Sequence, residues 1–397
     1  MKLRTRLLAG FLACGLLPIV AVATANLLTA KSGTLSIETA ARADLEQKAQ
    51  DHLVALRDIK KQQIEDYFNS IRDQVLTFSE DRMVIDAMRD FREAFSTYGG
   101  ERGIEETTFE RMKSELRTYY TGEFETEYKS QNNGQAAGVQ SLFAQLDKDS
   151  IALQHAYIRA NHHPLGSKHL LDAAETDTAY GKLHQKYHPI IRSFLEKFGY
   201  YDIFLVDPQT GDIVYSVFKE LDYTTSLLEG PYSQTNFGEA FRQANAAATK
   251  DAVILVDFKQ YKPSYEAPAS FIASPIFDGT EKVGVLVFQM PVDRINAVMG
   301  FRSGMGETGE TYAVGPDNLL RSNTYRDQEN RTIVASFRNP ETGSVENPVV
   351  QKALAGAAGV QLSTNYFGEE VLSGYAPADV LGLRWAILAE IATAEAF

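Results

Sequence analysis

The sequence predicts an α+β fold in which one long helix and further helices precede two antiparallel-sheet modules. Apolar residues recur at helical spacing from Ser36 to about Asp90, with neither Pro nor Gly between them. After Gly199 the pattern changes to short apolar runs separated by turn residues. The predicted order of two strands, a helix and three strands then occurs twice. With 397 residues, 44% of them hydrophobic, the chain is long enough for two or three domains with cores.

The N-terminus has the composition of a membrane anchor. Lys2, Arg4 and Arg6 precede a mainly apolar run from Leu7 to Leu28, which matches the roughly 20 residues that a helix needs to cross a bilayer. Positive charge in front of such a run places the N-terminus in the cytoplasm. A cleaved signal peptide is the alternative, but the run is longer than the ~7 to 15 residues of a signal peptide's apolar core. We therefore assign residues 1–30 to a cytoplasmic N-terminus and transmembrane anchor.

A long amphipathic stalk helix is predicted over residues 31–95. Such a helix cannot bury its apolar stripe alone, so it packs on a domain, on a second copy, or on both. Homodimerisation through this helix is one hypothesis. Residues 96–198 form a helical insertion, with breaks expected at 132–138 and 161–166, where Asn, Gly and Pro gather.

The first module is predicted over residues 199–295. A hairpin begins it, and Pro208 and Gly211 mark the turn. A helix and three more strands follow, and Asp278-Gly279 is a hairpin signal between the last two strands.

The second module, residues 296–397, is predicted to repeat this order. Its first hairpin is "GETGETYAVGPDNLLRSN", residues 306–323, with Glu310 and Arg321 on opposite arms. We expect these two side chains to form a cross-strand ion pair that has a structural role. The following helix has Asn347 as its N-cap and Pro348 at its first position, with Gly356 past its end.

Composition disfavours several classes of function. The formal net charge of −13 argues against nucleic acid, which requires clustered Lys and Arg. The single cysteine, Cys14, excludes an intramolecular disulfide. Neither a nucleophile elbow, a zinc-protease motif, a phosphate loop nor a dinucleotide fingerprint occurs, so we expect no catalytic residues and no cofactor.

All seven histidines fall between His52 and His188. His184 and His188 are four residues apart on one helical face, a spacing that can hold a metal. Because no carboxylate accompanies them at fixed spacing, we predict surface histidines and no metal site.

A cleft in the first module is the expected ligand site. Asp257 is the most informative residue, because it places a carboxylate in an otherwise apolar strand, where it needs a partner. A ligand ammonium would be one partner, and Lys259, Lys262 or water are the alternatives. Lys219, Glu220 and Asp222 form either a charged lid or a solvated loop. The candidate ligand-binding residues are Tyr215, Lys219, Asp222, Tyr232, Asp257, Tyr261, Ser264, Tyr265 and Ser270.

The stretches "GETGETYAVGPDNLLRSN" and "GYAPADVLGLRWAILAEIATAEAF", residues 374–397, resemble the double-Cache extracellular sensor regions of bacterial receptors, chiefly methyl-accepting chemotaxis proteins. The resemblance implies a stalk helix followed by two PAS-like modules, a membrane-distal one (199–295) that usually holds the ligand and a membrane-proximal one (296–397). The Tyr, Arg, Trp, Tyr and Asp set by which amino-acid sensors of this class hold their ligand has no evident counterpart.

The resemblance implies the extracytoplasmic ligand-sensing region of a transmembrane chemoreceptor in the inner membrane, with its sensor region periplasmic or extracellular. The expected ligand is a small polar molecule, and an amine-bearing one if Asp257 binds it. Two alternatives remain open. The same sensor is compatible with output through an adenylate cyclase or a histidine kinase. An interaction module that docks a periplasmic binding protein is the other, and it predicts an exposed apolar patch on residues 105–197.

Overall fold

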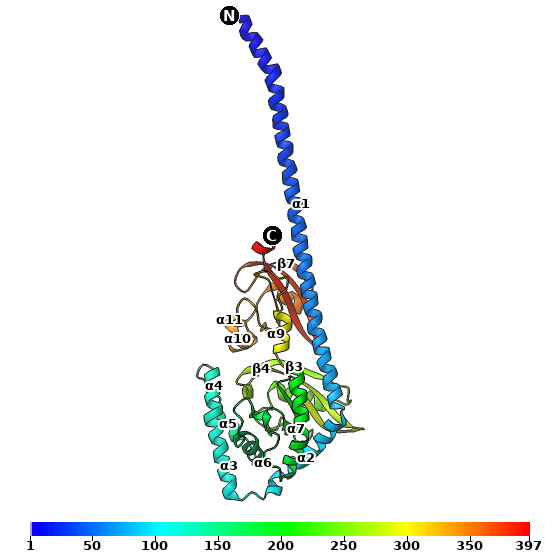
Figure 1. Ribbon diagram of the computed structural model, residues 1–397, viewed down its shortest axis with the longest axis vertical. Coiled ribbons are helices and arrows are strands. Elements are labelled where there is room, and N and C mark those ends of the chain that lie inside the picture. The colour runs from blue at the N-terminus through cyan, green and yellow to red at the C-terminus, as the bar shows by residue number, and fades with distance from the viewer. Residues whose placement is uncertain (1) are drawn as a thin grey trace.

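The computed structural model describes the backbone of residues 2–397 and the side chains of residues 22–24 and 39–397. Its longest element is α1 (Lys2–Ser79), a helix of 78 residues that spans about 120 Å at 1.5 Å per residue. The second half of α1 runs beside both sheets, and the first half extends beyond them (Figure 1). The predicted α+β architecture of a long helix with two antiparallel sheets is therefore confirmed.

The predicted membrane anchor, residues 1–30, lies largely in α1, but its side chains other than those of residues 22–24 fall outside the described part. Among the residues that are described, no helix combines the length and apolar character required to cross a bilayer.

The predicted stalk is interrupted before its expected end. Helix α1 stops at Ser79, and α2 (Arg82–Arg102) begins after a two-residue break. Asp81 has an extended backbone, and its carboxylate accepts a 2.7 Å hydrogen bond from the backbone N–H of Met83, which caps the new helix. Because neither Gly nor Pro marks this position, the apolar periodicity alone did not reveal the break.

Residues 106–198, most of the predicted insertion, are mainly helical and belong to the same half of the molecule as the first sheet (Figure 1). The predicted interruptions at 132–138 and 161–166 are both non-helical. Two single-turn π-helices, η1 and η2, lie within this layer. Its elements are α3 (Glu106–Tyr119), η1 (Tyr120–Phe124), α4 (Glu125–Gln131), α5 (Val139–Phe143), α6 (Lys148–Gln154), η2 (His155–Arg159), the 3₁₀ turn η3 (Lys168–Leu170) and α7 (Ala179–Phe198).

The first module contains a five-stranded antiparallel sheet in the order β2-β1-β5-β4-β3. Helix α8 (Asn236–Ala246) lies between β2 and β3 in sequence, as predicted. Gly211 and Gly279 have φ of +74° and +64° at the two predicted turns, a conformation that favours glycine. The strands are β1 (Asp202–Val206), β2 (Ile213–Ser216), β3 (Ile254–Tyr261), β4 (Ala267–Asp278) and β5 (Glu281–Gln289).

The second module contains a four-stranded antiparallel sheet in the order β6-β9-β8-β7. The strands are β6 (Glu310–Val314), β7 (Gly359–Thr364), β8 (Glu370–Val380) and β9 (Leu383–Ala392). The predicted second arm of its first hairpin is only an isolated bridge between Val314 and Leu320. The helices of this module are α9 (Asp293–Gly300), α10 (Ile333–Arg338), α11 (Pro340–Gly343), α12 (Pro348–Leu354) and α13 (Thr393–Ala396), and Asn347 caps α12 as expected.

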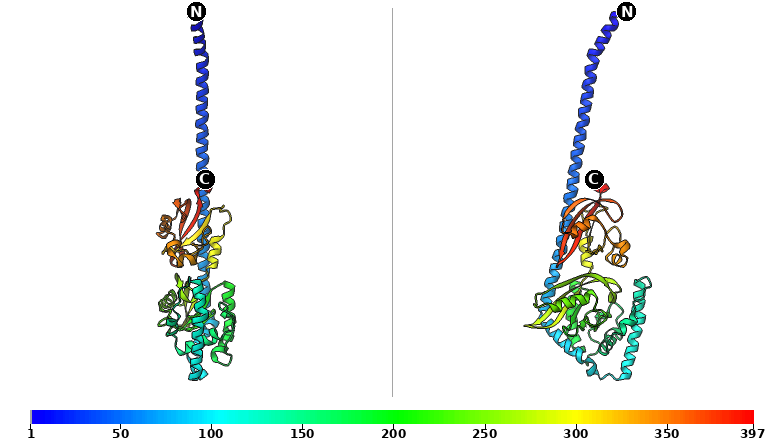
Figure 2. Two further views of the ribbon diagram at one scale, coloured as in Figure 1. Left: turned by 90° about the vertical axis from the view of Figure 1, so that its left-hand side faces the viewer. Right: turned by 180° about the vertical axis from the view of Figure 1, so that it is seen from behind.

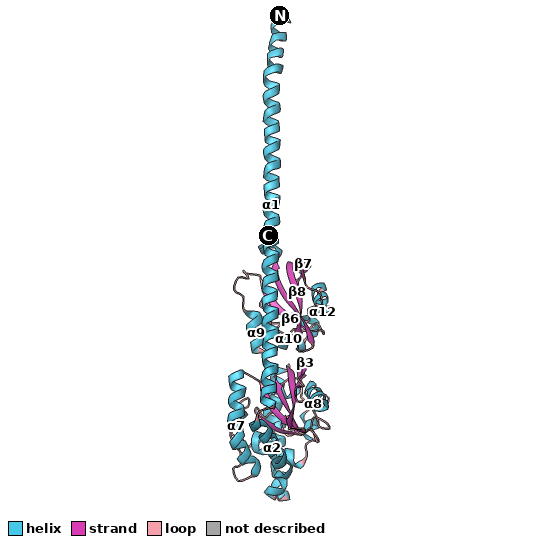
Figure 3. Cartoon of the chain, turned by 90° about the vertical axis from the view of Figure 1, so that its right-hand side faces the viewer, coloured by secondary structure: helices cyan, strands magenta, loops and turns pink. Residues whose placement is uncertain are grey.

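Both sheets lie beside the same helix (Figure 3). One apolar core runs from α1 through the first sheet into β8 and β9, and the rings of Phe68 in α1 and Trp385 in β9 meet edge to face at 5.3 Å. The C-terminus lies at the end of the second module that faces the N-terminal half of α1 (Figure 2). This core therefore joins the two modules and α1.

Candidate functional site

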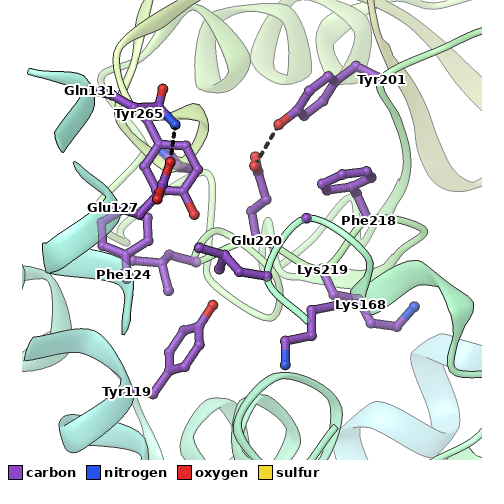
Figure 4. A pocket seen from close by; sticks show the side chains of 14 residues that line it. Tyr119, Phe124, Glu127, Gln131, Lys168, Tyr201, Phe218, Lys219, Glu220 and Tyr265 are labelled. Carbon is purple, nitrogen blue, oxygen red and sulfur yellow. Dashed lines mark hydrogen bonds between the residues drawn. The ribbon is translucent and has the colours of Figure 1, made fainter. Parts of the chain in front are cut away.

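A cavity of about 340 Å³ lies between the helical insertion and the loops of the first sheet. Its wall from the insertion consists of residues in or near α3, η1, α4 and η3, and its opposite wall comes from segments next to β1, β2 and β3 (Figure 4). The lining residues are Tyr119, Phe124, Glu127, Gln131, Leu165, Gly166, Lys168, Tyr201, Phe218, Lys219, Glu220, Leu221, Pro263 and Tyr265.

Aromatic rings form much of the wall. Phe124 and Tyr265 stack with their centroids 5.1 Å apart, and Tyr201 and Phe218 lie 5.0 Å apart. The hydroxyl of Tyr119 points toward the middle of the cavity (Figure 4). Within the described part of the chain this hydroxyl has no hydrogen-bond partner, so it is available to a ligand.

Glu220 places a carboxylate in the wall. Its two oxygens accept hydrogen bonds from the hydroxyls of Tyr201, at 2.7 Å, and Ser264, at 2.9 Å. Among the described residues, neither lysine nor arginine forms an ion pair with it. Burial, with a further contribution from the nearby Asp222 carboxylate, raises the pKa of Glu220 well above its usual value.

The two lysines of the wall have their ammonium groups occupied elsewhere. Lys168 Nζ donates to the carbonyl oxygens of Asn161 and His163, at 2.8 and 2.6 Å. Lys219 Nζ donates to the carbonyls of Ser216 and Val217, and burial lowers its pKa to about 7. The carboxylate of Glu220 therefore lacks a cationic partner in a wall that contains two lysines.

Asp202 fixes the turn that brings Lys219 and Glu220 to the cavity. Its carboxylate accepts hydrogen bonds from the backbone N–H groups of Val217 and Phe218, at 2.9 and 3.0 Å, and from the hydroxyl of Ser216. These bonds accompany a left-handed backbone at Lys219, with φ of +61°. Asp202, which is buried and does not line the cavity, thus helps to position the charged residues Lys219 and Glu220 in its wall.

A second buried polar cluster follows Glu220 in sequence. Asp222 accepts a 2.6 Å hydrogen bond from the Tyr261 hydroxyl, and burial raises the pKa of this carboxyl to about 6. The other oxygen of Asp222 and the hydroxyl of Tyr232 are buried without a hydrogen-bond partner among the described residues. The predicted solvated loop at 219–222 is wrong, because Lys219 and Asp222 are 2% and 1% exposed. The alternative, a charged lid, stays a prediction, and Lys219 and Glu220 line the cavity.

The structure distributes the predicted ligand-binding residues over several environments. Lys219 and Tyr265 line the cavity, and Ser264 bonds to Glu220. Asp222, Tyr232 and Tyr261 belong to the buried cluster. Away from the lining, the Tyr215 hydroxyl contacts His188, Ser270 bonds to the carbonyl of Val256, and Asp257 contacts the second module.

Most of the cavity wall came from residues that the sequence did not single out. Tyr119, Phe124, Glu127, Gln131 and Lys168 belong to the insertion and reach the site only through tertiary packing. The sequence shows that the insertion is rich in Tyr and Glu, but it does not show which of these side chains reach the cavity.

Asp257 is paired within the protein rather than with either predicted lysine. Arg321 donates to it through Nε and Nη2, both at 2.9 Å, and Trp385 Nε1 lies 3.2 Å away. Lys259 instead pairs with Glu239, and Lys262 donates to the carbonyl of Ala137. The carboxylate therefore has its charge satisfied at the contact between the modules, which removes the argument for a ligand ammonium at this position.

The predicted Glu310–Arg321 pair is wrong for the same reason. Arg321 turns toward Asp257 and Asp317. Glu310 instead accepts hydrogen bonds from the backbone N–H groups of Tyr325 and Arg326 and from the Tyr366 hydroxyl.

His184 and His188 are buried, and the prediction of surface histidines at these positions is wrong. Both are 0% exposed, and their rings stack 4.3 Å apart. His188 Nδ1 lies 2.7 Å from the Tyr215 hydroxyl, and burial lowers the pKa of both imidazoles. Among the described residues, no group of three or more His, Cys, Asp or Glu side chains has the arrangement of a metal site.

In a comparison with known protein families, residues 114–397 match the family described as Cache domain. No curated relative matches the chain in sequence. Several solved structures are similar at low identity.

The ligand-binding domain of the Pseudomonas aeruginosa PAO1 amino acid chemoreceptor PctB, in complex with L-Arg, is 14% identical, with 53% of this chain and 80% of that one covered and a TM-score of 0.35. The ligand-binding domain of the Pseudomonas fluorescens chemoreceptor CtaA, in complex with L-leucine, is 13% identical, with 77% and 98% covered and a TM-score of 0.34. The sensor domain of the V. cholerae histidine kinase DctB is 13% identical, with 69% and 98% covered and a TM-score of 0.35.

Proposed function

Because this chain belongs to the Cache domain family, we propose that it is the extracytoplasmic ligand-sensing region of a bacterial transmembrane chemoreceptor in the inner membrane. We further propose that its ligand is a small organic cation, bound in the cavity of the first module. Proteins of this kind act by binding, so no reaction is assigned to the site.

The unpaired carboxylate of Glu220 is the observation that supports a cationic ligand. A carboxylate taken out of water without a cation either costs several kcal/mol or remains protonated. A ligand ammonium beside Glu220 would supply the missing charge. Glu127, which accepts a hydrogen bond from Gln131 in the same wall, adds a second carboxylate.

The aromatic wall supports the same ligand class. Faces of Tyr and Phe rings attract ammonium groups, with about 0.5 to 2 kcal/mol per favourable contact. Phe124, Tyr201, Phe218 and Tyr265 surround the space next to Glu220 (Figure 4). The volume of about 340 Å³ is at the lower end of the range for small-molecule sites, which favours a ligand of few heavy atoms.

Signalling requires that the ligand bind one conformation more tightly than another. The cavity wall contains segments from the insertion and segments next to strands of the first sheet. A ligand that contacts both walls would therefore favour the conformation in which the two walls lie closest together. The contact of Arg321 with Asp257 and of Trp385 with Phe68 would convey that change to the second module and α1. Homodimerisation through α1 remains a hypothesis of this proposal.

The docking alternative has less support. It predicts an exposed apolar patch over residues 105–197, but in this described stretch the large apolar side chains with high exposure are Leu170, at 45%, and Ile190, at 53%. They lie in different elements, η3 and α7.

A thermal-shift screen of the full chain in a non-ionic detergent tests the ligand class. The library contains amines, quaternary ammonium compounds, amino acids, carboxylates, sugars and purines. A ligand at a hundred times its dissociation constant stabilises the folded state by about 2.7 kcal/mol. We expect organic cations to raise the melting temperature. Shifts caused only by carboxylates or sugars would contradict the proposal.

A further inference from the structure

Two glutamates face each other in the core of the second module. Glu310 begins β6 and Glu390 lies directly opposite it in β9, so both side chains are on the same face of the sheet. They are 1% and 2% exposed. Like charges in this arrangement repel, and burial increases the cost of holding both.

The hydrogen-bond partners differentiate the two carboxyl groups. Glu310 accepts hydrogen bonds from two backbone N–H groups, those of Tyr325 at 3.0 Å and Arg326 at 3.2 Å. Burial raises the pKa of Glu310, and these partners oppose that rise, because a backbone N–H can only donate and so favours the ionised carboxylate.

Glu390 instead has only hydroxyl partners among the described residues. Ser373 Oγ lies 2.8 Å from one of its oxygens and the Tyr312 hydroxyl 2.9 Å from the other. A hydroxyl can donate to a carboxylate or accept from a carboxylic acid. Both protonation states of Glu390 can therefore keep hydrogen bonds in the same place.

The charged and titratable groups around the pair do not neutralise it. Arg326 is a cation whose charge acts on both carboxyl groups, but its guanidinium pairs with Glu369 at 2.6 Å. Tyr312 and Tyr366 face the carboxyl groups from β6 and from the turn between β7 and β8, and burial raises the pKa of both phenols. In the described part of the chain, neither glutamate forms an ion pair.

We propose that Glu310 and Glu390 together form a proton-binding site, and that it gives this chain a second sensory function, the detection of external pH. Glu390 gains and loses the proton while Glu310 remains ionised. This function needs no ligand in the cavity of the first module and does not depend on the identity of that ligand.

The position of the pair connects protonation to the end of the chain. Glu390 lies in β9, which leads into α13 and the C-terminus, and Glu310 holds the backbone at Tyr325 and Arg326. Loss of the proton places two negative charges across β6 and β9 and weakens their pairing. In the second sheet, β6 is an edge strand and pairs with β9.

The direction of the pH effect follows from the burial of Glu390, which raises the pKa of its carboxyl to about 7. An unfolded glutamate titrates near about 4.3. Between these values the folded state holds a proton that the unfolded state has lost, so the contribution of Glu390 to stability falls as pH rises from about 5 to 7 and levels off above.

The only tryptophan of the chain, Trp385, lies buried in β9 and reports on this module. We would follow urea unfolding of the full chain by its fluorescence between pH 5 and 8. The variants are Glu390→Gln, Glu310→Gln and, as a control, Glu329→Gln, which alters an exposed glutamate of the same module.

We expect the urea midpoint of the unaltered chain, measured relative to that of the Glu390→Gln variant at the same pH, to decrease from pH 5 to 7, because this difference isolates Glu390 from the other titrating groups. The control, compared with Glu390→Gln in the same way, should keep that decrease. Glu310→Gln removes the like charge and should move the decrease to lower pH, which tests the proposal even if Glu390→Gln does not fold. If the folded variants of both glutamates follow the pH curve of the unaltered chain, the proton site is refuted.

Discussion

Asp257 of β3 accepts two 2.9 Å hydrogen bonds from the guanidinium of Arg321, which belongs to the second module. Arg321 is 1% exposed, so this bidentate pair is largely removed from water. Trp385 Nε1 lies 3.2 Å from the same carboxylate, and its ring contacts Phe68 of α1. The Asp257 carboxylate therefore joins the first sheet to the second module, and Trp385 extends this connection to α1.

Replacing Asp257 with Ala should destabilise the chain strongly. Arg321 would keep only the half-exposed Asp317 as an acidic partner, and loss of one member of a buried pair typically costs about 3 to 5 kcal/mol. Urea unfolding followed by Trp385 fluorescence measures this. Lys259→Ala is the control, because it removes an exposed pair with Glu239 and should cost no more than about 1 kcal/mol. Equal effects of the two changes would argue against a structural role for Asp257.

Gly315 should be sensitive to a single methyl group. A Cβ at this position would lie 2.2 Å from Cζ of Arg321, so Gly315→Ala must displace the guanidinium from Asp257. Overpacking of this kind typically costs about 1 to 3 kcal/mol. Gly300→Ala is a matched control, because an added Cβ there meets nothing within 4 Å. Urea unfolding compares the two variants, and a tolerated Gly315→Ala would contradict the close contact.

The buried histidines should make the first module less stable in acid. Burial lowers the pKa of His184, so this imidazole stays neutral in the folded state while the unfolded chain takes up a proton below about pH 6.5. The contribution of His184 to stability should therefore fall as pH decreases from 6.5 to 5, opposite in sign to the contribution of Glu390. His184→Gln should reduce that slope by up to about 1.4 kcal/mol per pH unit. Unfolding followed by circular dichroism measures it.

The exposed His162 provides the control for this pH effect. His162→Gln should leave the slope unchanged. If His184→Gln and His162→Gln change the slope equally, the buried imidazole is not the source of the acid sensitivity.

Tyr265 should contribute to cation binding through its ring. It stacks on Phe124 in the cavity wall, and loss of one cation–π contact of about 0.5 to 2 kcal/mol weakens binding about 2- to 30-fold. We would measure Tyr265→Ala by calorimetry with choline as the probe. Tyr325→Ala, which changes an exposed aromatic residue of the second module, should leave the affinity unaltered. A Tyr265→Ala variant with undiminished affinity would exclude this ring from the binding site.

Much of the fold was predictable because local signals determine it. Turn residues at Pro208, Gly211 and Gly279 and the cap at Asn347 mark element ends in the sequence, and the structure confirms them. The break after Ser79 was not predictable from Gly or Pro, because a capping carboxylate produces it.

The site was predicted only in part, because its walls come from distant segments. Lys219 and Tyr265 were identified from the strands of the first module, whereas Tyr119 and Lys168 reach the cavity from the insertion. Asp257 was recognised correctly as a carboxylate that needs a partner. Its partner is Arg321, 64 residues away in sequence, which the local pattern could not indicate.

The most direct measurement is calorimetry on the full chain with choline and with its neutral isostere, 3,3-dimethylbutan-1-ol. The two probes have nearly the same shape and differ in charge. We expect choline to bind at least about tenfold more tightly, a difference of about 1.4 kcal/mol, and Glu220→Gln to reduce that preference, with the remainder due to the aromatic wall. Equal affinity of the two probes, or a preference for choline that is unchanged in Glu220→Gln, would contradict a cation site at Glu220.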